Sequence, residues 1–165
     1  MISISRMGGE FFPERLAAFF SAHAPKDGSL YITKGDVEPG RSIDGEAWVP
    51  DLIEVVAQEL RTAPHTKHVL VAHRAYAESP LPVIRGFLIG STRGPHADVE
   101  DIVVHVDDRS EGVGRALFFA FEEIARQQGC MGLLGQINPK NAASIRAARS
   151  WGMIGESGTV IKTLT

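Results

Sequence analysis

The sequence predicts a single α/β (α+β) domain, residues 1–165, built around one sheet. Its 165 residues fall within the usual size of one domain, and 44% hydrophobic residues are enough for a core. Short runs that alternate like strands are interleaved with longer runs of helical periodicity. Their order is strand, two helices, three strands, helix, strand, helix and strand, which is typical of a sheet covered by helices.

The first part of the chain contains one predicted strand, two predicted helices and a long loop. Residues 2–7, ISISRM, alternate like a short strand, and Pro13 suits the first turn of a helix that follows. Residues 25–47 are rich in Gly, Pro and Asp and read as a loop with one short strand at LYIT, residues 30–33. Apolar residues at helical spacing predict a second helix within residues 49–63.

The middle of the chain predicts three strands and the clearest helix. Residues 67–75 and 82–90 read as two strands joined by a turn-rich segment, and residues 99–106, VEDIVVHV, are a third, strongly β-branched strand. From Val113 onward apolar residues follow the i, i+3, i+4, i+7 pattern of a helix, which Gly129 ends.

The last part predicts a strand, a helix and a final strand or hairpin. Residues 131–137, MGLLGQI, form the strand, and Asn138 with Pro139 supplies the N-cap and first turn of a helix that runs to about Trp151. Residues 153–165 form the last strand or hairpin.

Charge and cysteine content limit the classes of function. The net charge of -3 and the pI near 6.1 give little electrostatic support for nucleic-acid binding. Cys130 is the only cysteine, which excludes an internal disulfide, fits a reducing compartment and predicts a buried structural thiol. The N-terminus lacks a signal-peptide core and no apolar run is long enough to span a bilayer. A cytoplasmic protein without a nucleic-acid or membrane partner is expected.

The stretch RSEGVGRAL, residues 109–117, joins a predicted strand to a helix and suits an anion. Backbone N–H groups at a helix start lack intrahelical partners, and the helix dipole favours negative charge there. Gly112 and Gly114 remove side chains that would obstruct a phosphate, while Arg109 and Arg115 add positive charge. A tight turn without a ligand is the alternative. The sequence matches neither the P-loop nor the dinucleotide fingerprint, which argues against a nucleotide-binding module.

Two motifs resemble the GNAT family of N-acetyltransferases. Strand VEDIVVHV, then Arg109 three residues before Gly112, then GVG, is similar to the family signature Arg/Gln-x-x-Gly-x-Gly/Ala. The segment GQINPKNAASIRAARSWGM, residues 135–153, is similar to the second signature and is most like the phosphinothricin acetyltransferase branch, while VEDIVV resembles the glucosamine 6-phosphate acetyltransferases. The resemblance covers residues 68–155, and residues 1–65 fit only in outline.

This resemblance implies a fold and an activity. The fold is a GNAT-like domain whose central mixed, mostly antiparallel sheet is flanked by about four helices. Residues 68–155 form the acetyl-CoA-binding core, and residues 1–65 form the acceptor side. The implied activity is transfer of an acetyl group from acetyl-CoA to a primary amine of a small molecule by direct attack. Whether the protein forms a homodimer stays open.

The resemblance also implies how the coenzyme is held. The pantetheine arm lies along Ile102, Val103 and Val104 as an added strand would, and the Val104 amide stabilises the oxyanion, an effect worth ~3 kcal/mol where such donors have been removed. Asn141 contacts the pantetheine region. The pyrophosphate is bound by the loop residues Arg109, Ser110, Glu111, Gly112, Val113, Gly114 and Arg115. A Gly114→Glu change is expected to remove coenzyme binding and leave the fold.

Two residues depart from the family pattern. Glu111 stands where many relatives have Gly or a basic residue, so its carboxylate points to solvent or weakens pyrophosphate binding. Ala148 occupies the position of a Tyr that protonates the departing thiolate in relatives. Water could supply that proton, and a different acid remains open. The alternative is a non-catalytic acyl-CoA-binding sensor or scaffold of the same fold.

Glu100 is the first candidate for the base that amine acetylation needs. It lies four residues before Val104, so a regular strand places both side chains on one face, with Asp101 and His105 on the other. A bulge would alter this parity. The alternative role of Glu100 is a structural carboxylate, and His73 is a weaker candidate for the base.

The remaining candidates are weaker. His65 and His68 lack nearby carboxylates or cysteines, so no metal is predicted. Three aromatic residues are candidates for the acceptor pocket or for ordinary packing, and three basic residues of the last helix are candidates for the adenosine 3'-phosphate or for a solvated face. The aromatic residues are Tyr31, Trp48 and Tyr76, and the basic residues are Lys140, Arg146 and Arg149.

Overall fold

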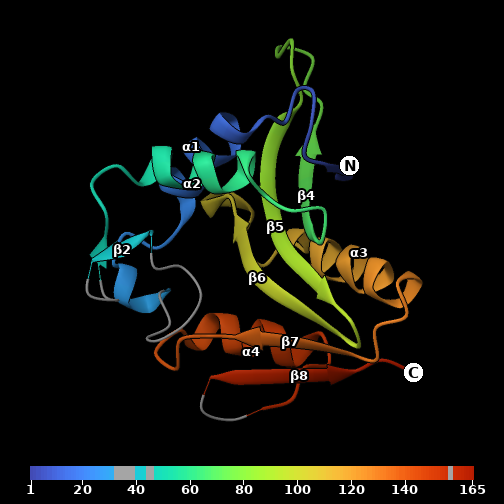
Figure 1. Ribbon diagram of the computed structural model, residues 1–165. Helices are drawn as coiled ribbons and strands as arrows, with labels where there is room; N and C mark the ends of the chain where they lie inside the picture. Colours follow the sequence, from blue (N-terminus) through green and yellow to red (C-terminus); the bar gives the residue numbers. More distant parts are fainter. Residues whose placement is uncertain (32–39, 44–46, 156–157) are drawn as a thin grey trace.

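The computed structural model, which describes residues 1–31, 40–43, 47–155 and 158–165, follows the predicted order of elements, with a short two-strand ribbon added (Figure 1). The strands are β1 (Ser3–Arg6), β2 (Ser42–Ile43), β3 (Ala47–Trp48), β4 (Lys67–Arg74), β5 (Val83–Arg93), β6 (His96–Val104), β7 (Gly132–Gln136) and β8 (Thr159–Thr163). The helices are α1 (Pro13–His23), α2 (Leu52–Arg61), α3 (Val113–Gln127) and α4 (Ala142–Ser150), with 3-10 turns η1 (Gly28–Leu30) and η2 (Val106–Asp108).

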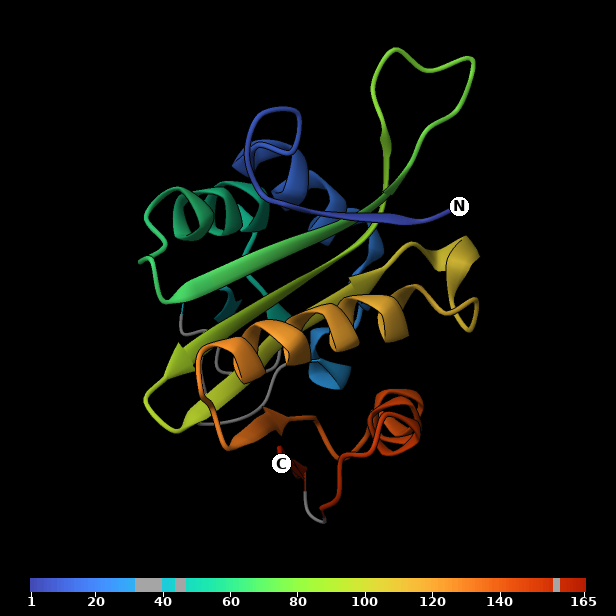
Figure 2. The ribbon, with the colours of Figure 1, turned by 90° about the vertical axis from the view of Figure 1, so that its right-hand side faces the viewer.

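Six strands form one mixed sheet in the order β1-β4-β5-β6-β7-β8. Neighbouring strands are antiparallel except for β6 and β7, which are parallel. The mixed, mostly antiparallel sheet implied by the resemblance is therefore confirmed. Figure 2 shows α3 lying along β5 and β6, while β7, α4 and β8 form the lower part of the molecule.

Each face of the sheet has its own apolar core. Helices α1 and α2 cover one face, where Phe20 of α1 packs with Phe87 of β5. Helix α3 covers the other face with the predicted stripe, including Leu117 and Phe121. A methyl group added to Gly90 would lie only 2.4 Å from the Phe121 ring, so this glycine lets α3 approach the sheet. Each large buried side chain contributes about 1.5–3 kcal/mol to folding.

Three predicted element boundaries are corrected. Helix α4 does not begin at Asn138, because the Asn138 side chain accepts the Lys140 N–H (2.9 Å) and makes a separate turn. Its N-cap is Asn141, whose side chain accepts the Ser144 N–H (3.2 Å). Strand β6 begins at His96, before the predicted run. In the predicted strand LYIT, Leu30 belongs to η1, and residues 32–33 lie outside the described residues.

Two expectations about the chain as a whole can be compared with the fold. Cys130 is buried against the α3 core, and this burial raises the pKa of its thiol, which agrees with a structural role. Among the helices of the described residues, none combines the length and apolar character that crossing a membrane requires.

Candidate active site

Strands β6 and β7 separate partway along the sheet. They pair only where His96–Val99 meets Gly132–Gly135. Beyond Val99, β6 continues to Val104 in pairing with β5, while β7 leads into the turn before α4. Among the described strands, none therefore pairs with the second half of β6 on the side of β7.

The backbone of this open edge points into the split. The His105 N–H donates to the Arg85 carbonyl (2.9 Å), which makes this pair a hydrogen-bonded pair of the β5–β6 ladder. Hydrogen-bonded and non-hydrogen-bonded pairs alternate in an antiparallel ladder. The N–H groups of Ile102 and Val104 therefore point away from β5, toward the open side.

A bulge in β6 alters the predicted parity at Glu100. Gly90 pairs with Val99 and Ile89 pairs with Asp101, so Glu100 is the extra residue. Its carboxylate accepts a hydrogen bond from Ser91 Oγ (3.0 Å) and lies 3.2 Å from Lys67 Nζ.

Ser91 and Lys67 are register partners, and Lys67 shares the strand face of Val69 and Val71, which belong to the core beneath α1 and α2. The Glu100 carboxylate therefore points to the α1–α2 face. Val104 packs with the α3 core on the opposite face. The expectation that Glu100 and Val104 share one face is wrong because the bulge inserts one residue between them.

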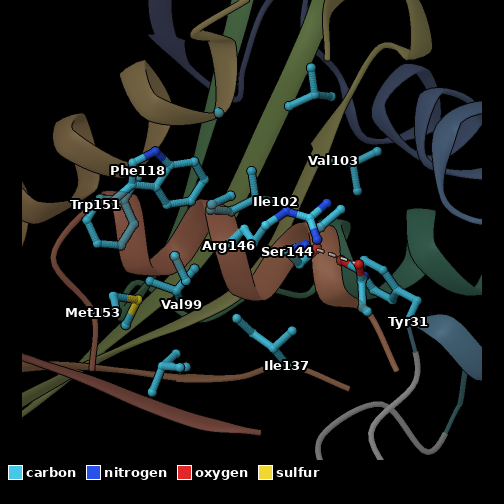
Figure 3. Close-up of a pocket in the computed structure, with 18 of the residues that line it drawn as sticks. Tyr31, Val99, Ile102, Val103, Phe118, Ile137, Ser144, Arg146, Trp151 and Met153 are labelled. Atoms are coloured by element: carbon cyan, nitrogen blue, oxygen red, sulfur yellow. Dashed lines mark hydrogen bonds between the residues drawn. The ribbon is translucent and has the colours of Figure 1, made fainter. Parts of the chain in front are cut away.

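A cleft of about 1000 Å³ opens at the split and has two halves of different chemistry. Figure 3 shows apolar side chains around one half and Tyr31 at its opposite end. The apolar half is lined by Val99, Ile102, Val104, Phe118, Gly135, Ile137, Ala148, Trp151, Met153 and Val160. The polar half is lined by Tyr31, Asp98, Glu100 and Asn138. The cleft can thus receive one ligand from the α3–α4 side and another from the α1 side.

The glycine-rich loop lies at the mouth of the cleft. Ser110 and Gly112 have positive φ angles of 68° and 88°, and α3 begins at Val113. A non-glycine residue rarely adopts such an angle, and this conformation turns the chain sharply before the helix. Arg109 Nη2 donates to the His23 carbonyl (2.7 Å), which ties the loop to the end of α1.

The predicted loop residues do not all face the cleft. Arg109, Ser110, Gly112, Gly114 and Arg115 line it. The Glu111 side chain is exposed, which is the first of the two alternatives given for this departure from the family pattern, and the Glu111 N–H donates to the Asp108 carbonyl (3.1 Å). The Val113 side chain belongs to the α3 core, so only its backbone can serve a ligand.

Gly114 lies at a position where a side chain would narrow the cleft. A Cβ there would lie 3.3 Å from the Trp151 ring and 3.6 Å from Val104 Cγ2. The glycine therefore keeps the passage between the loop and the apolar half of the cleft open.

Helix α4 forms the wall opposite β6. Asn141 lines the cleft, but its side-chain oxygen already caps the helix, so only its amide N–H groups remain to serve a ligand. Ser144 and Ala148 follow on the same helix face, at intervals of three and four residues. Ala148 is 3% exposed, and its methyl group stands where the resemblance expects a phenol.

A buried charged network that the sequence analysis did not identify supports the polar half. Asp101 is 2% exposed, accepts the Tyr31 hydroxyl hydrogen bond and lies 3.2 Å from Arg41 Nη1. Arg41 is 3% exposed and also pairs with Glu59 at 2.7 Å. The sequence did contain a signal for this network. A carboxylate inside the apolar run VEDIVV indicates a buried charge, and a buried charge requires a partner.

His23 and His105 form a second feature that the sequence analysis missed. Their rings lie 4.1 Å apart, beside the loop that Arg109 anchors. The Val106 N–H donates to His23 Nδ1 (3.3 Å), and the Asp107 N–H donates to His105 Nδ1 (3.1 Å). Burial lowers the pKa of His23, and the neighbouring His105 and Arg109 lower it further.

Several predicted candidates lie outside the cleft lining. His73 bonds Ser5 at the β1 side of the sheet (2.8 Å), and His68 is buried beside Thr92 (3.1 Å). Of the aromatic and basic candidates, only Tyr31 and Arg146 line the cleft. Those that do not are Trp48, Tyr76, Lys140 and Arg149. Within the described ranges, no group of three His, Cys, Asp or Glu side chains is placed to hold a metal ion.

Several solved structures similar to this chain over nearly its whole length are named acetyltransferases. Nourseothricin acetyltransferase is 20% identical with a TM-score of 0.61 over 99% of each chain. The PaiA N-acetyltransferase of Thermoplasma acidophilum, in complex with coenzyme A, is 13% identical with a TM-score of 0.64 over 99% of each chain. An aminoglycoside N-acetyltransferase in complex with CoA is 16% identical with a TM-score of 0.63, over 95% of this chain and 90% of its own. At these identities the likeness shows the fold.

Family membership rests on sequence. No curated protein matches the chain at a significant level. The model of the acetyltransferase (GNAT) family matches residues 41–153, which include the split strand, the glycine-rich loop and α4. The chain therefore belongs to the GNAT family of acetyltransferases and is an acyltransferase of that family.

Proposed function

We propose that the protein transfers an acetyl group from acetyl-CoA to a primary amine of a small molecule. The observation that carries this proposal is the open edge of β6, whose Ile102 and Val104 N–H groups point into a cleft that ends at a helix start. An extended pantetheine arm pairs with such an edge as an added strand, and its pyrophosphate suits the backbone amides at the start of α3.

The loop and α4 supply the remaining coenzyme contacts in this proposal. Backbone amides between Ser110 and Arg115 hold the pyrophosphate, with the Arg109 and Arg115 side chains at its rim. The Asn141 amide donates to the pantetheine arm. The apolar half of the cleft excludes water from the thioester, which strengthens every hydrogen bond to the reacting carbonyl.

The amine enters from the polar half, on the side of α1 and α2. Residues 1–65 contribute Tyr31 to this side, which supports their role as the acceptor region. Glu100 accepts the ammonium proton through a water molecule, because this residue lines the cleft and its carboxylate is already held in place by Ser91 and Lys67.

The chemical step then runs by direct attack. The amine nitrogen bonds to the thioester carbonyl carbon, and the Val104 N–H donates to the developing oxyanion. The tetrahedral intermediate gives up one N–H proton to water as the carbon–sulfur bond breaks, and water returns a proton to the departing thiolate, since Ala148 offers none. The products are the acetylated amine and coenzyme A.

Two measurements test this proposal. Calorimetry should show micromolar or tighter binding of coenzyme A and acetyl-CoA, and a panel of small primary amines should include acceptors that release thiol from acetyl-CoA above the hydrolysis rate. No coenzyme A binding would overturn the whole proposal. Binding without thiol release for any amine would favour the second candidate, a non-catalytic acyl-CoA sensor, for which Ala148 is the supporting observation.

A further inference from the structure

A buried ion pair lies behind the polar half of the cleft. We infer that Asp101 is a positioning residue, whose carboxylate holds the Tyr31 hydroxyl so that the Tyr31 side chain forms a fixed wall for the acceptor amine beside Glu100. This inference deepens the proposed function and rests on it, because it takes the acceptor side of the cleft from it.

The network joins buried charges to the cleft through Tyr31. Asp101 and Arg41 are 2% and 3% exposed, and Asp101 Oδ2 lies 3.2 Å from Arg41 Nη1. Arg41 Nη2 lies 2.7 Å from a carboxylate oxygen of Glu59 in α2. Of these four residues, Tyr31 is the one that lines the cleft, and its hydroxyl donates to the Asp101 carboxylate. A ligand in the polar half can therefore touch a group that the buried charges hold.

Stability alone does not account for these buried charges. Apolar residues of similar volume in place of a buried ion pair often leave stability unchanged or raise it. The surroundings are apolar here, because the Arg41 guanidinium carbon lies 4.8 Å from the centre of the buried Phe20 ring. A satisfied polar network does fix the groups that it binds, and the group that it binds at the cleft is the Tyr31 hydroxyl.

Contacts at the ring and at the hydroxyl fix the Tyr31 side chain. Its ring packs edge-on against Phe20, with ring centroids 5.7 Å apart and an interplanar angle of 83°, and its centroid lies 5.6 Å from that of Trp48. Asp101 holds the far end of the side chain. Little rotamer freedom is left for Tyr31 to lose when an acceptor binds, which favours binding.

The bulge in β6 brings this wall next to the proposed base. Asp101 pairs with Ile89, a residue of the core beneath α1 and α2, so Asp101 faces that side of the sheet. Consecutive residues of a regular strand point to opposite faces, but Glu100 is the extra residue of the bulge and its carboxylate points to the same face. Glu100 and Tyr31 both line the cleft, so an amine that reaches Glu100 also approaches Tyr31.

Acceptor kinetics in two variants test the inference. The acceptor is the best substrate among n-butylamine, benzylamine and ethanolamine, and thiol release is the assay. Tyr31→Phe keeps the ring and removes its tether, so the KM for the amine should rise about tenfold, with a smaller change in kcat and an unchanged dissociation constant for coenzyme A. Asp101→Ala should give a similar rise alone and no further rise in the Tyr31→Phe background, because Asp101 acts through the phenol.

Glu59→Gln is the matched control. It removes the charge of the other carboxylate beside Arg41 and leaves the contact between Tyr31 and Asp101 in place. Both Glu59→Gln and Asp101→Ala should lower the melting temperature, whereas the KM for the amine should rise only in Asp101→Ala.

Two results would overturn the inference and leave the proposed function standing. One is an unchanged KM in folded Tyr31→Phe, and the other is a KM that rises equally in Glu59→Gln. If Asp101→Ala does not fold, Tyr31→Phe and Glu59→Gln still decide. If the unmodified protein releases no thiol with any small primary amine, the proposed function fails and this inference fails with it.

Discussion

Glu100 and Asp101 are adjacent carboxylates in β6, and the bulge places them in different surroundings. Asp101 is buried between Arg41 and the Tyr31 hydroxyl, whereas Glu100 lines the cleft and pairs with the half-buried Lys67. An ion pair as accessible as Lys67–Glu100 contributes at most about 1 kcal/mol to stability. In the proposed function, Glu100 therefore combines a small structural role with access to the acceptor.

Glu100→Gln should separate proton transfer from binding. The amide keeps the shape but cannot accept the amine proton, so turnover with an accepted amine should fall about 100-fold while coenzyme affinity stays nearly unchanged. The loss should shrink at high pH, where the amine arrives already deprotonated. Asp98→Asn, two residues earlier in the same half of the cleft, is the control for loss of charge alone. A pH-independent loss in Glu100→Gln would indicate positioning rather than proton abstraction.

Ala148→Tyr tests the missing acid. A phenol on this face of α4 should protonate the departing thiolate and raise acetyl transfer about tenfold or more. Ala148→Phe adds the same ring without the hydroxyl, so any gain should be absent there. Thiol release and melting temperature should be measured for both variants. Equal rates in the two variants would show that thiolate protonation does not limit turnover.

At the scale of elements, the loop before α3 and the helix itself act together. Gly114→Glu should reduce coenzyme affinity at least 100-fold, because a carboxylate would stand between Trp151 and Val104 near the pyrophosphate. Gly114→Ala adds only the methyl group, 3.3 Å from the Trp151 ring, and should lower affinity much less. Calorimetry with coenzyme A compares them. Unchanged affinity in the glutamate variant would mean that the phosphates bind elsewhere.

Elements with a strong periodic pattern were predictable from the sequence. The α3 stripe and the β-branched run of β6 were identified because each reflects burial against one partner face. The start of α4 was not, because Asn138 and Asn141 both precede helical sequence and only their hydrogen bonds distinguish a turn from a cap.

The parts of the candidate site that follow a local motif were predicted from the sequence, and the parts that depend on long-range contacts were not. The loop follows a local motif, so its place in the chain and most of its cleft-facing residues were identified. The face of Glu100 depends on a bulge set by pairing with β5, and the His23–His105 contact joins residues 82 positions apart. Such long-range contacts leave no periodic signal in the sequence.

At the scale of the whole molecule, one buried and two partly buried histidines make stability depend on pH. Burial lowers the pKa of His23, His68 and His73 below 6.5. The unfolded chain therefore takes up protons near that value that the folded chain does not, so stability present above about pH 6.5 is lost as the pH falls through that value. Arg85 holds the pKa of Asp108 below 3.8, and that contribution is lost only in stronger acid.

Urea unfolding should show this dependence. Between about pH 7.5 and about pH 5.5, where histidines titrate, the midpoint should fall. His73→Gln should reduce the change, and replacement of the exposed His65 by Gln should leave it as it is. A midpoint that stays constant over this range would contradict the assigned burial effect.

The split between β6 and β7 also divides the hydrogen-bond network of the sheet. Within the described residues, four register pairs with β6 join β7, and through it β8, to the rest of the sheet. In hydrogen exchange, the amides of these two strands should open as a separate cooperative unit, at a lower free energy than those of β4 and β5. In the proposed function, a coenzyme bound along β6 would close this seam as a removable seventh strand, so its departure after each turnover would loosen β7, α4 and β8.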